Sequence, residues 1–145
     1  MDRTDVGLSS LRAMPLFSGV TEHDLLSILK MGEIRSYEPG QAIVERGEIG
    51  DSLFIILRGT AGVDVAGDPH DLAEGDFFGE MALMAGKERT ATVQARENLQ
   101  ALRIGADDFQ RFLLQQPQVG LAMLKGLIDR WRDVQGRLEA WAGIG

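Results

Sequence analysis

The residues best suited to chemistry lie in one stretch, residues 75–95, which reads G-D-F-F-G-E-M-A-L-M-A-G-K-E-R-T-A-T-V-Q-A. Gly79 permits a tight turn or a close approach of the backbone. The residues from Glu80 to Met84 are strong helix formers and Gly86 ends the run, which predicts a helix of one or two turns. Because a helix start leaves backbone N–H groups free, we expect those from Gly79 to Ala82 to form an anion site.

Two charged side chains flank this turn and define the anion that it would bind. Arg89, at the start of the following strand, can reach back over the short helix, where its planar guanidinium suits a phosphate group. Glu80 would repel a phosphate if it pointed inward, so it fits only if it accepts hydrogen bonds from hydroxyl groups, such as those of a ribose. The spacing alone leaves a second interpretation open, a surface helix with a solvated Glu80–Arg89 pair.

Apolar segments separated by glycines surround this stretch and predict the scaffold that holds it. Eighteen of the 145 residues are glycine, and half of these lie between Gly40 and Gly86. The run Ser52–Arg58 suits a strand buried on both faces. Residues 61–66 and 91–96 alternate as strands do, and residues 99–104 follow across a turn. Short strands with regular turn signals predict a β-sandwich, jelly roll or barrel.

Helical patterns occupy both ends of the chain. Thr21 followed by Asp24 resembles a capping box with Asp in place of Glu, and it opens a helix at Glu22–Met31. We also expect helices at residues 5–13, 107–116 and 118–141. In the last of these, apolar residues recur at alternating intervals of three and four: Leu124, Leu127, Trp131, Val134, Leu138 and Trp141. This seam either packs one helix on the barrel or joins two copies of the chain.

Residues 78–91 resemble the phosphate-binding cassette of the cyclic-nucleotide-binding domain family, the sensor domain of catabolite-activator-like proteins, cyclic-nucleotide-dependent kinases and cyclic-nucleotide-gated channels. The family pattern is close to F-G-E-[LM]-A-L, a variable loop, then R-[TSA]-A. Here it reads F-G-E-M-A-L over residues 78–83 and R-T-A over residues 89–91. The segments G-E-I-G-D-S-L-F-I-I at 47–56 and L-R-G-T-A-G-V at 57–63 are similar to the family's early strands and turn. The resemblance covers about residues 11–134.

The resemblance implies a mainly β fold with flanking helices, in the α+β class. We expect one cyclic-nucleotide-binding domain over residues 1–145. Its parts are N-terminal helices in 1–31, an eight-stranded jelly-roll-like β-roll in 32–105 and C-terminal helices in 106–142. A short phosphate-binding helix would lie within the roll, and the long last helix would act as a lid. The chain is then a stand-alone sensor subunit or a domain of a longer protein.

The resemblance also implies the ligand contacts, residue by residue. Arg89 would pair with the cyclic phosphate, and backbone N–H groups near Met81 and Ala82 would add hydrogen bonds to it. Glu80 would accept from the ribose 2′-OH, and Thr90 would contact the phosphate or the base. The other expected binding residues are Gly79 and Ala91 in the cassette, Val63 and Leu72 at the purine, and Arg130 and Val134 in the lid. Arg130 also fits a plain exposed charge.

The implied function is a non-catalytic cyclic-nucleotide sensor in signal transduction, without a cofactor, whose C-terminal helix moves when ligand binds. The ligand is cAMP or cGMP. Thr90 occurs in relatives of either preference, and we expect cAMP. The last helix leaves a homodimer open, and the downstream effector is unknown. The alternative function is an interaction protein with a degenerate β-roll that dimerises through that helix and binds no nucleotide.

Composition argues against several other classes. A formal net charge of −7 disfavours bulk attraction to nucleic acid or an anionic membrane, and the absence of cysteine removes thiol chemistry. His23 and His70, the two histidines, lack the cluster that a metal-binding cupin needs, so no metal is expected. No stretch approaches the ~20 apolar residues of a membrane helix and no secretory signal is present, so we expect a cytoplasmic location. Helix-turn-helix, P-loop, kinase and cyclase motifs are also absent.

Overall fold

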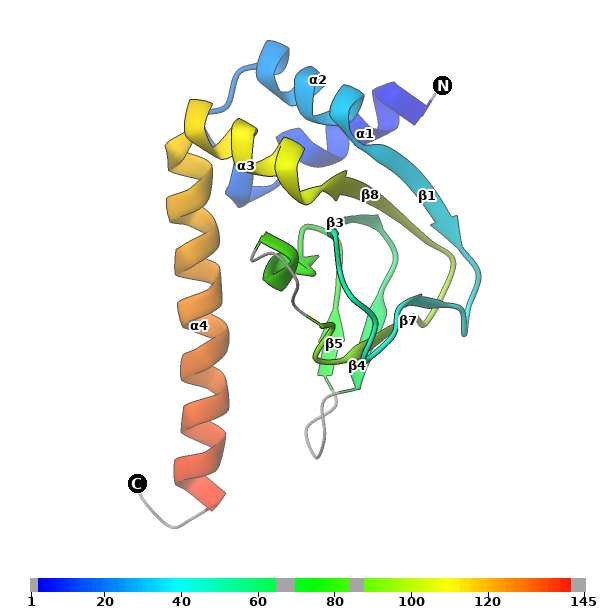
Figure 1. Ribbon diagram of the computed structural model, residues 1–145, viewed down its shortest axis with the longest axis vertical. Helices are drawn as coiled ribbons and strands as arrows, with labels where there is room; N and C mark the ends of the chain where they lie inside the picture. The colour runs from blue at the N-terminus through cyan, green and yellow to red at the C-terminus, as the bar shows by residue number, and fades with distance from the viewer. Residues whose placement is uncertain (1–2, 65–69, 84–87, 142–145) are drawn as a thin grey trace.

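Helices lie at both ends of the chain and strands lie between them (Figure 1). The computed structural model describes residues 3–64, 70–83 and 88–141, and for residues 3–6, 70, 81, 130, 131 and 133–141 it describes the backbone alone. The first elements are α1 (Arg3–Arg12), the 3₁₀ helix η1 (Pro15–Phe17) and α2 (Glu22–Met31). The strands and the last helices are β1 (Glu33–Tyr37), β2 (Ala42–Val44), β3 (Ser52–Arg58), β4 (Ala61–Asp64), β5 (His70–Leu72), β6 (Phe77–Phe78), the 3₁₀ helix η2 (Glu80–Leu83), β7 (Thr92–Ala95), β8 (Leu99–Gly105), α3 (Ala106–Gln115) and α4 (Pro117–Trp141).

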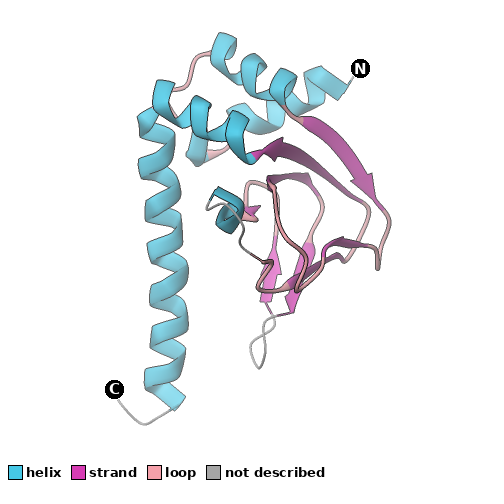
Figure 2. Cartoon of the chain, in the orientation of Figure 1, coloured by secondary structure: helices cyan, strands magenta, loops and turns pink. Residues whose placement is uncertain are grey.

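The strands form two antiparallel four-stranded sheets (Figure 2). One sheet has the order β1-β8-β3-β6 and the other the order β2-β7-β4-β5. In the first sheet β8 lies between β1 and β3 and pairs with both along most of its length. The prediction of a mainly β roll with eight strands and flanking helices, in the α+β class, is therefore confirmed for the described part of the chain.

Strand β3 separates two apolar cores. Its first six residues are all buried, as the unbroken apolar run predicts. Successive side chains of a strand point to opposite faces. Leu53, Ile55 and Leu57 therefore join the cluster under the helices, whereas Phe54 and Ile56 join the cluster inside the roll. This alternation means that a single strand fixes the helices to one side and supports the interior of the roll on the other.

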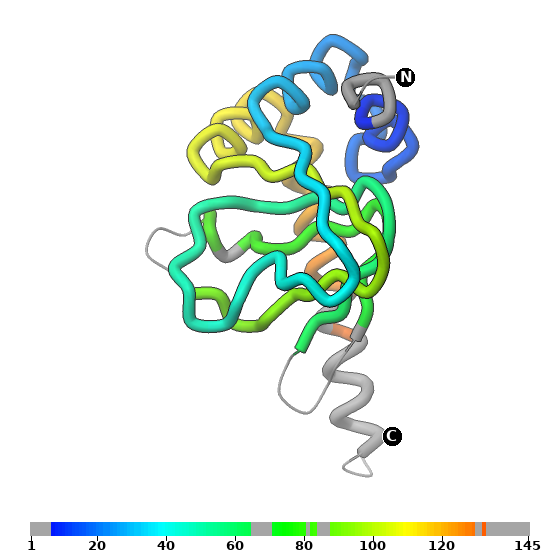
Figure 3. Tube along the Cα trace, turned by 90° about the vertical axis from the view of Figure 1, so that its right-hand side faces the viewer, coloured from blue at the N-terminus to red at the C-terminus, as the bar shows by residue number. Residues whose placement is uncertain are grey.

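The helices cover the outer face of the first sheet at one end of the roll (Figure 3). Leu11 from α1, Ile28 from α2, Phe109 from α3 and Val119 from α4 are each fully buried in the same cluster. Burying a large apolar side chain contributes about 1.5–3 kcal/mol, so these anchors hold the four helices on the roll.

The predicted cap of α2 is confirmed. The Thr21 hydroxyl oxygen accepts a hydrogen bond from the Asp24 backbone N–H at 3.2 Å, and the same hydroxyl donates to the Asp24 carboxylate at 3.0 Å. The Asp24 carboxylate also accepts from Nε2 of Gln116 at 2.7 Å. Because Gln116 lies between α3 and α4, the start of α2 is tied to the junction of the C-terminal helices.

The predicted helix boundaries differ from the observed ones by one or two residues. The first helix begins at Arg3 rather than residue 5, and α3 begins and ends one residue earlier than predicted. Pro117 follows the end of α3, as expected, and it is also the first residue of α4. At the first position of a helix the backbone N–H has no partner within the helix, so proline, which lacks this N–H, is suited to it. Residues 65 and 66 of the predicted strand at 61–66 lie outside the described residues.

Helix α4 presents different apolar residues to the core and to solvent. Val119 and Met123 are buried, and Leu127 packs partly buried against the same cluster. Leu121 and Leu124 are 68% and 54% exposed and lie on the outer side of the helix. The predicted seam is therefore divided, since Leu127 packs on the core and Leu124 does not; the side chains of its other four members lie outside the described residues.

None of the helices in the described ranges is long and apolar enough to span a membrane. Helix α4 has 25 residues, and charged residues occur in it from Lys125 onward, including Asp129 and Arg132.

Candidate functional site

Gly79 joins β6 to η2 at a point that only glycine fits. Its φ is +84°, in the left-handed region. A Cβ atom there would lie 2.7 Å from Nη1 of Arg89 and 2.9 Å from the Ser52 carbonyl oxygen. Both the backbone conformation and the space around it therefore require glycine, in agreement with the predicted close approach of the backbone.

The turn after Gly79 is a 3₁₀ helix, which is wound more tightly than an α-helix. Residues Glu80–Leu83 form a single 3₁₀ turn, and the predicted positions Met84 and Gly86 lie outside the described residues. The Ala82 N–H donates to the Gly79 carbonyl at 3.0 Å. The expectation that every N–H from Gly79 to Ala82 is free is therefore wrong for Ala82, because a 3₁₀ turn uses the N–H three residues after its first carbonyl.

Helix α3 contacts the other end of this turn. Nε2 of Gln110 donates to the Leu83 carbonyl oxygen at 2.7 Å. The Leu83 side chain packs against the cluster under the helices. The cassette is therefore attached to the C-terminal helices by a polar and an apolar contact.

The backbone of Arg89 is paired with the loop before β3. Its N–H donates to the Glu48 carbonyl at 2.7 Å, and its carbonyl accepts from the Gly47 N–H at 3.0 Å. Glu88 forms a bridge with Ile49 beside it. These contacts fix the point from which the Arg89 side chain extends toward η2.

The Arg89 guanidinium reaches the turn at Gly79, as the sequence predicts. Its Nη2 donates to the Ser52 carbonyl at 2.9 Å and its Nη1 to the Gly79 carbonyl at 3.4 Å. Its Cζ atom lies 5.9 Å from the centre of the Phe54 ring, within cation–π range. In the described part of the chain no carboxylate forms an ion pair with it. Neutral carbonyls thus hold a partly buried cation.

Burial lowers the pKa of Arg89 below the usual arginine value, because desolvation penalises the charged form. The negative charges of Asp51, Glu48 and Glu80 oppose this shift, whereas the positive charge of Arg103 reinforces it. An anion placed beside this guanidinium would replace part of the lost hydration. The electrostatics therefore favour an anionic partner at Arg89.

Arg103 and Asp51 form an ion pair near this site. Nη2 of Arg103 donates to Oδ1 of Asp51 at 3.1 Å. Arg103 lies on β8 directly opposite Phe54 on β3. Sequence reasoning missed both residues as neighbours of Arg89; the available signal was a charged residue inside the buried run of β8.

The apolar residues predicted at the purine line the interior of the roll. Val63 and Leu72 are 8% and 5% exposed and belong to the cluster that contains Phe54. The Phe54 and Phe78 rings stack with centroids 5.1 Å apart. Partly buried Ala91 packs against this cluster, whereas Thr90 is exposed. The structure thus brings Val63, Leu72 and Ala91 to the same cluster as the ring beside Arg89.

The other predicted residues are only partly described. Glu80 is half-buried at the start of η2. The backbone of Met81 lies in η2, and the backbones of Arg130 and Val134 lie in α4. The side chains of these three residues lie outside the described residues. Their predicted contacts with a ligand stay predictions.

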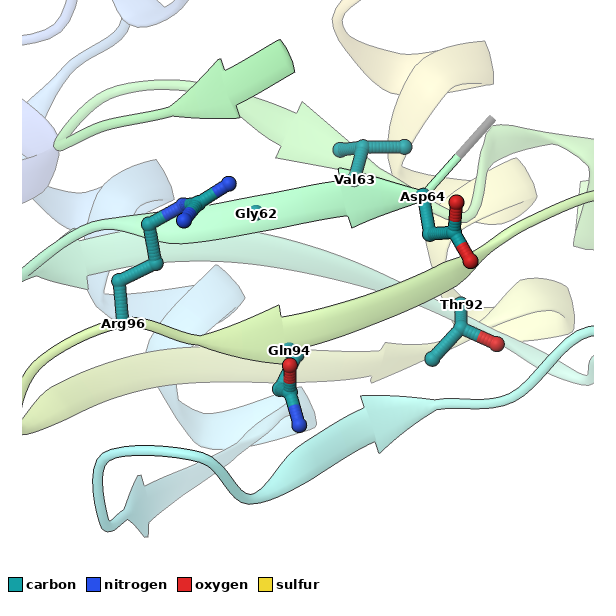
Figure 4. A pocket seen from close by; sticks show the side chains of 6 residues that line it. All are labelled: Gly62, Val63, Asp64, Thr92, Gln94 and Arg96. Atoms are coloured by element: carbon teal, nitrogen blue, oxygen red, sulfur yellow. The ribbon is translucent and has the colours of Figure 1, made fainter. Parts of the chain in front are cut away.

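A separate hollow of about 190 Å³ lies on the sheet β2-β7-β4-β5 (Figure 4). Its lining residues are Gly62, Val63, Asp64, Thr92, Gln94 and Arg96. Asp64, Gln94 and Arg96 are exposed, and Nε of Arg96 pairs with Asp71 at 2.7 Å. Gln94 and Arg96 alternate with the buried Val93 and Ala95, so they lie on the outer face of the sheet. Val63, by contrast, also belongs to the buried cluster that contains Phe54.

A metal centre is not indicated by the side chains that the structure describes. Among them, no three His, Asp or Glu residues come close enough together to hold a metal ion.

Comparisons with known proteins show which family this chain resembles. The family model of the cyclic nucleotide-binding domain matches residues 34–116, more than half of the chain. The chain is 35% identical over 118 residues to a cyclic nucleotide-gated potassium channel of Rhizobium etli, a match that covers 81% of this chain and 33% of the channel. It is 34% identical over 105 residues to a cAMP-dependent protein kinase regulatory subunit of Eremothecium gossypii, covering 71% of this chain and 23% of the subunit.

The fold is also similar to those of solved structures. The catabolite activator protein of Thermus thermophilus superposes with a TM-score of 0.74 at 25% identity, over 88% of this chain and 63% of that protein. The chain spans about a third or less of the length of the two curated relatives above. The matched pattern includes the Phe78–Gly79–Glu80 turn and the strands that support it. The chain therefore belongs to the cyclic nucleotide-binding domain family.

Proposed function

We propose that this chain is a non-catalytic sensor that binds cAMP in preference to cGMP, with Arg89 on the cyclic phosphate. The observation that carries the proposal is the partly buried Arg89 guanidinium, which donates to the carbonyls of Ser52 and Gly79 and forms no ion pair with a described carboxylate. A cyclic phosphate supplies the missing negative charge and can accept from several guanidinium N–H groups. Such a partner offsets the desolvation that lowers the pKa of Arg89.

The remaining cassette residues would bind the sugar and the phosphate. Gly79 lets the ligand approach the backbone, and the N–H groups of Met81 and Ala82 add donors at the phosphate. For Ala82 this requires that its hydrogen bond to the Gly79 carbonyl opens or is shared. Glu80 would accept from the ribose 2′-OH, and Thr90 would lie beside the phosphate or the base.

The base would lie against the apolar interior of the roll, next to Val63, Leu72 and Ala91. Arg130 and Val134, both on α4, would cover it from outside as parts of a lid. Thr90 is compatible with either purine, so the preference for cAMP is the finest part of the proposal, and it predicts a larger thermal shift with cAMP than with an equal concentration of cGMP.

Binding at η2 would move α4. Two contacts support this route, the hydrogen bond from Gln110 of α3 to the Leu83 carbonyl and the packing of α4 at Gly126 near the Phe77 ring. A ligand shifts the position of α4 only if it binds the two positions with different affinity. We propose that the whole of residues 1–145 acts as one such domain, in the cytoplasm, and signals to an effector through α4.

A second candidate function is an interaction protein that dimerises through α4 and binds no nucleotide. The observation in its favour is the outer side of α4, where Leu121, Leu124 and Ile128 are 68%, 54% and 42% exposed. A dimer is also compatible with the sensor. Sedimentation with and without nucleotide separates the two functions, since only the sensor responds to ligand.

A thermal-shift titration with cAMP and cGMP tests the proposed function. A ligand that binds only the folded chain stabilises it by about 2.7 kcal/mol at one hundred times its Kd, which corresponds to a shift on the order of 10 °C. We expect the wild type and Arg96→Ala, whose arginine lies on the outer sheet face, to shift. Arg89→Ala should shift much less at the same nucleotide concentration. Absence of a shift in nucleotide-free wild type would reject the sensor.

A further inference from the structure

Gly50, in the loop before β3, is buried and is not one of the residues proposed to contact the ligand. Its φ lies outside the left-handed region, so its backbone accepts any L-residue. A Cβ atom at this position would lie 2.5 Å from Cζ, 2.6 Å from Nε and 2.8 Å from Nη1 of Arg89. All three nearest atoms belong to one guanidinium group. The Arg89 guanidinium therefore occupies the space nearest to Gly50.

Gly79 lies against the same guanidinium, but a side chain at Gly79 would meet more than Arg89. Its Cβ would meet Nη1 of Arg89 and also the Ser52 carbonyl, and its φ is positive. A substitution at Gly79 thus disturbs the backbone together with Arg89. At Gly50, by contrast, the three atoms nearest to an added Cβ all belong to the Arg89 guanidinium, and φ is not positive.

We propose that Gly50 is a positioning residue for ligand binding, because its missing side chain leaves the space in which the Arg89 guanidinium is held for the cyclic phosphate. This inference rests on the proposed function. Carbon atoms in contact lie about 3.5 Å apart, so an alanine methyl group would displace the guanidinium by about 1 Å. Groups in a binding site need to be held within about 0.5 Å of their working position.

The fold should tolerate this displacement. The atoms that a Cβ would meet are the far end of a flexible side chain, which can swing away. The hydrogen bonds from Arg89 to the Ser52 and Gly79 carbonyls would then break. Gly50→Ala should therefore lower nucleotide affinity while the melting temperature without nucleotide stays close to that of the wild type.

Calorimetric titration of the chain with cAMP and cGMP provides the first readout. A hydrogen bond to a charged group contributes about 1.5–3 kcal/mol, so its loss in Gly50→Ala predicts an affinity about 10-fold or more below the wild type. The matched control is Gly62→Ala, whose Cβ would lie 2.6 Å from Nε of Arg96 on the outer sheet face. This control displaces an arginine in the same way away from the site, and it should bind as the wild type does.

A double-mutant cycle separates positioning from packing. In the Arg89→Ala background no guanidinium occupies the space, so Gly50→Ala should change the residual affinity less than about 2-fold. That affinity is measured by NMR titration at millimolar nucleotide. An equal loss in both backgrounds would show that Gly50 acts on the loop itself and would overturn the inference.

Crystal structures of the wild type and Gly50→Ala provide a readout that needs no ligand. We expect Nη2 of Arg89 to leave the Ser52 carbonyl in the variant. If it stays within hydrogen-bond distance, or if Gly50→Ala binds cAMP like the wild type, the inference is wrong. If the wild type binds neither nucleotide, the proposed function fails, and the crystal comparison alone decides whether Gly50 positions Arg89.

Discussion

The guanidinium of Arg89 is surrounded by carbonyl groups, an aromatic ring and glycines rather than by carboxylates. The Ser52 and Gly79 carbonyls orient it, and Phe54 lies within cation–π range of it. Neutral acceptors fix the direction of a cation without carrying an opposite charge. The proposed anion would add to the partial compensation that the charges of Asp51, Glu48 and Glu80 provide.

Replacing Arg89 by methionine tests whether the charge of Arg89 lowers the stability of the fold and is needed for nucleotide binding. Because burial lowers the pKa of Arg89, the folded state disfavours the charged form relative to the unfolded state. Removing the charge and keeping the volume should therefore leave the melting temperature without nucleotide at least as high as that of the wild type, while nucleotide binding is lost. Calorimetric melting and titration of Arg89→Met measure both. A clear fall in melting temperature would show that the arginine stabilises the fold.

At this scale the sequence predicts the cassette residues but not their surroundings. Gly79 and Arg89 stand in a recognisable pattern, and the structure brings them into contact. Ser52 and Gly50 could not be assigned, because their contacts with Arg89 depend on how the loop before β3 pairs with Glu88 and Arg89 in the folded chain. Such long-range contacts leave no periodic signal in the sequence.

The elements around the cassette connect η2 to the C-terminal helices, as the proposed movement of α4 requires. Turn η2 is connected to α3 by the Gln110 hydrogen bond, and α4 lies over the strand before the turn at Gly126. Strong patterns made β3 and α2 predictable, one by its continuous apolar run and the other by its Thr21 cap. Strands β2, β5 and β6 are two or three residues long, too short to show an alternation, so their bounds were not predicted.

Gly126 provides a stability prediction for α4. A Cβ there would lie 3.6 Å from Cε1 of Phe77, an ordinary contact. Glycine in a helix interior costs about 1 kcal/mol relative to alanine, so Gly126→Ala should raise the melting temperature by about 4 °C. Gly32→Ala is the opposite control. Its Cβ would lie 2.9 Å from the Arg103 carbonyl oxygen, so this variant should have a lower melting temperature than the wild type. A loss of stability in Gly126→Ala would mean that α4 packs more closely on Phe77 than described.

At the scale of the whole molecule, the described residues form two apolar cores, and further apolar side chains are exposed on α4. The cores hold the helices on the roll and fill the roll. The outer side of α4 has no partner among the described residues, although it carries Leu121, Leu124 and Ile128. The match to the Rhizobium etli channel covers only 33% of that channel. This surface could therefore pack against a second copy of the chain or against another part of a longer protein.

A double substitution tests the α4 surface as a dimer interface. Leu121 and Leu124 are more than half exposed, so Leu121→Glu with Leu124→Glu should leave the fold and nucleotide binding intact. It should separate the proposed dimer into monomers, because glutamate carboxylates of the two copies would be buried against each other. Analytical ultracentrifugation measures the mass. A variant that sediments like a dimeric wild type would place the interface elsewhere.

The central claim, that Arg89 binds the cyclic phosphate, is tested most directly by comparing cAMP with adenosine, which lacks the phosphate. We expect Arg89→Ala to lower the affinity for cAMP by about 30-fold or more, as removal of one partner of a buried charge pair does, and to leave the affinity for adenosine unchanged. Equal losses for both ligands, or no loss for cAMP, would contradict the account.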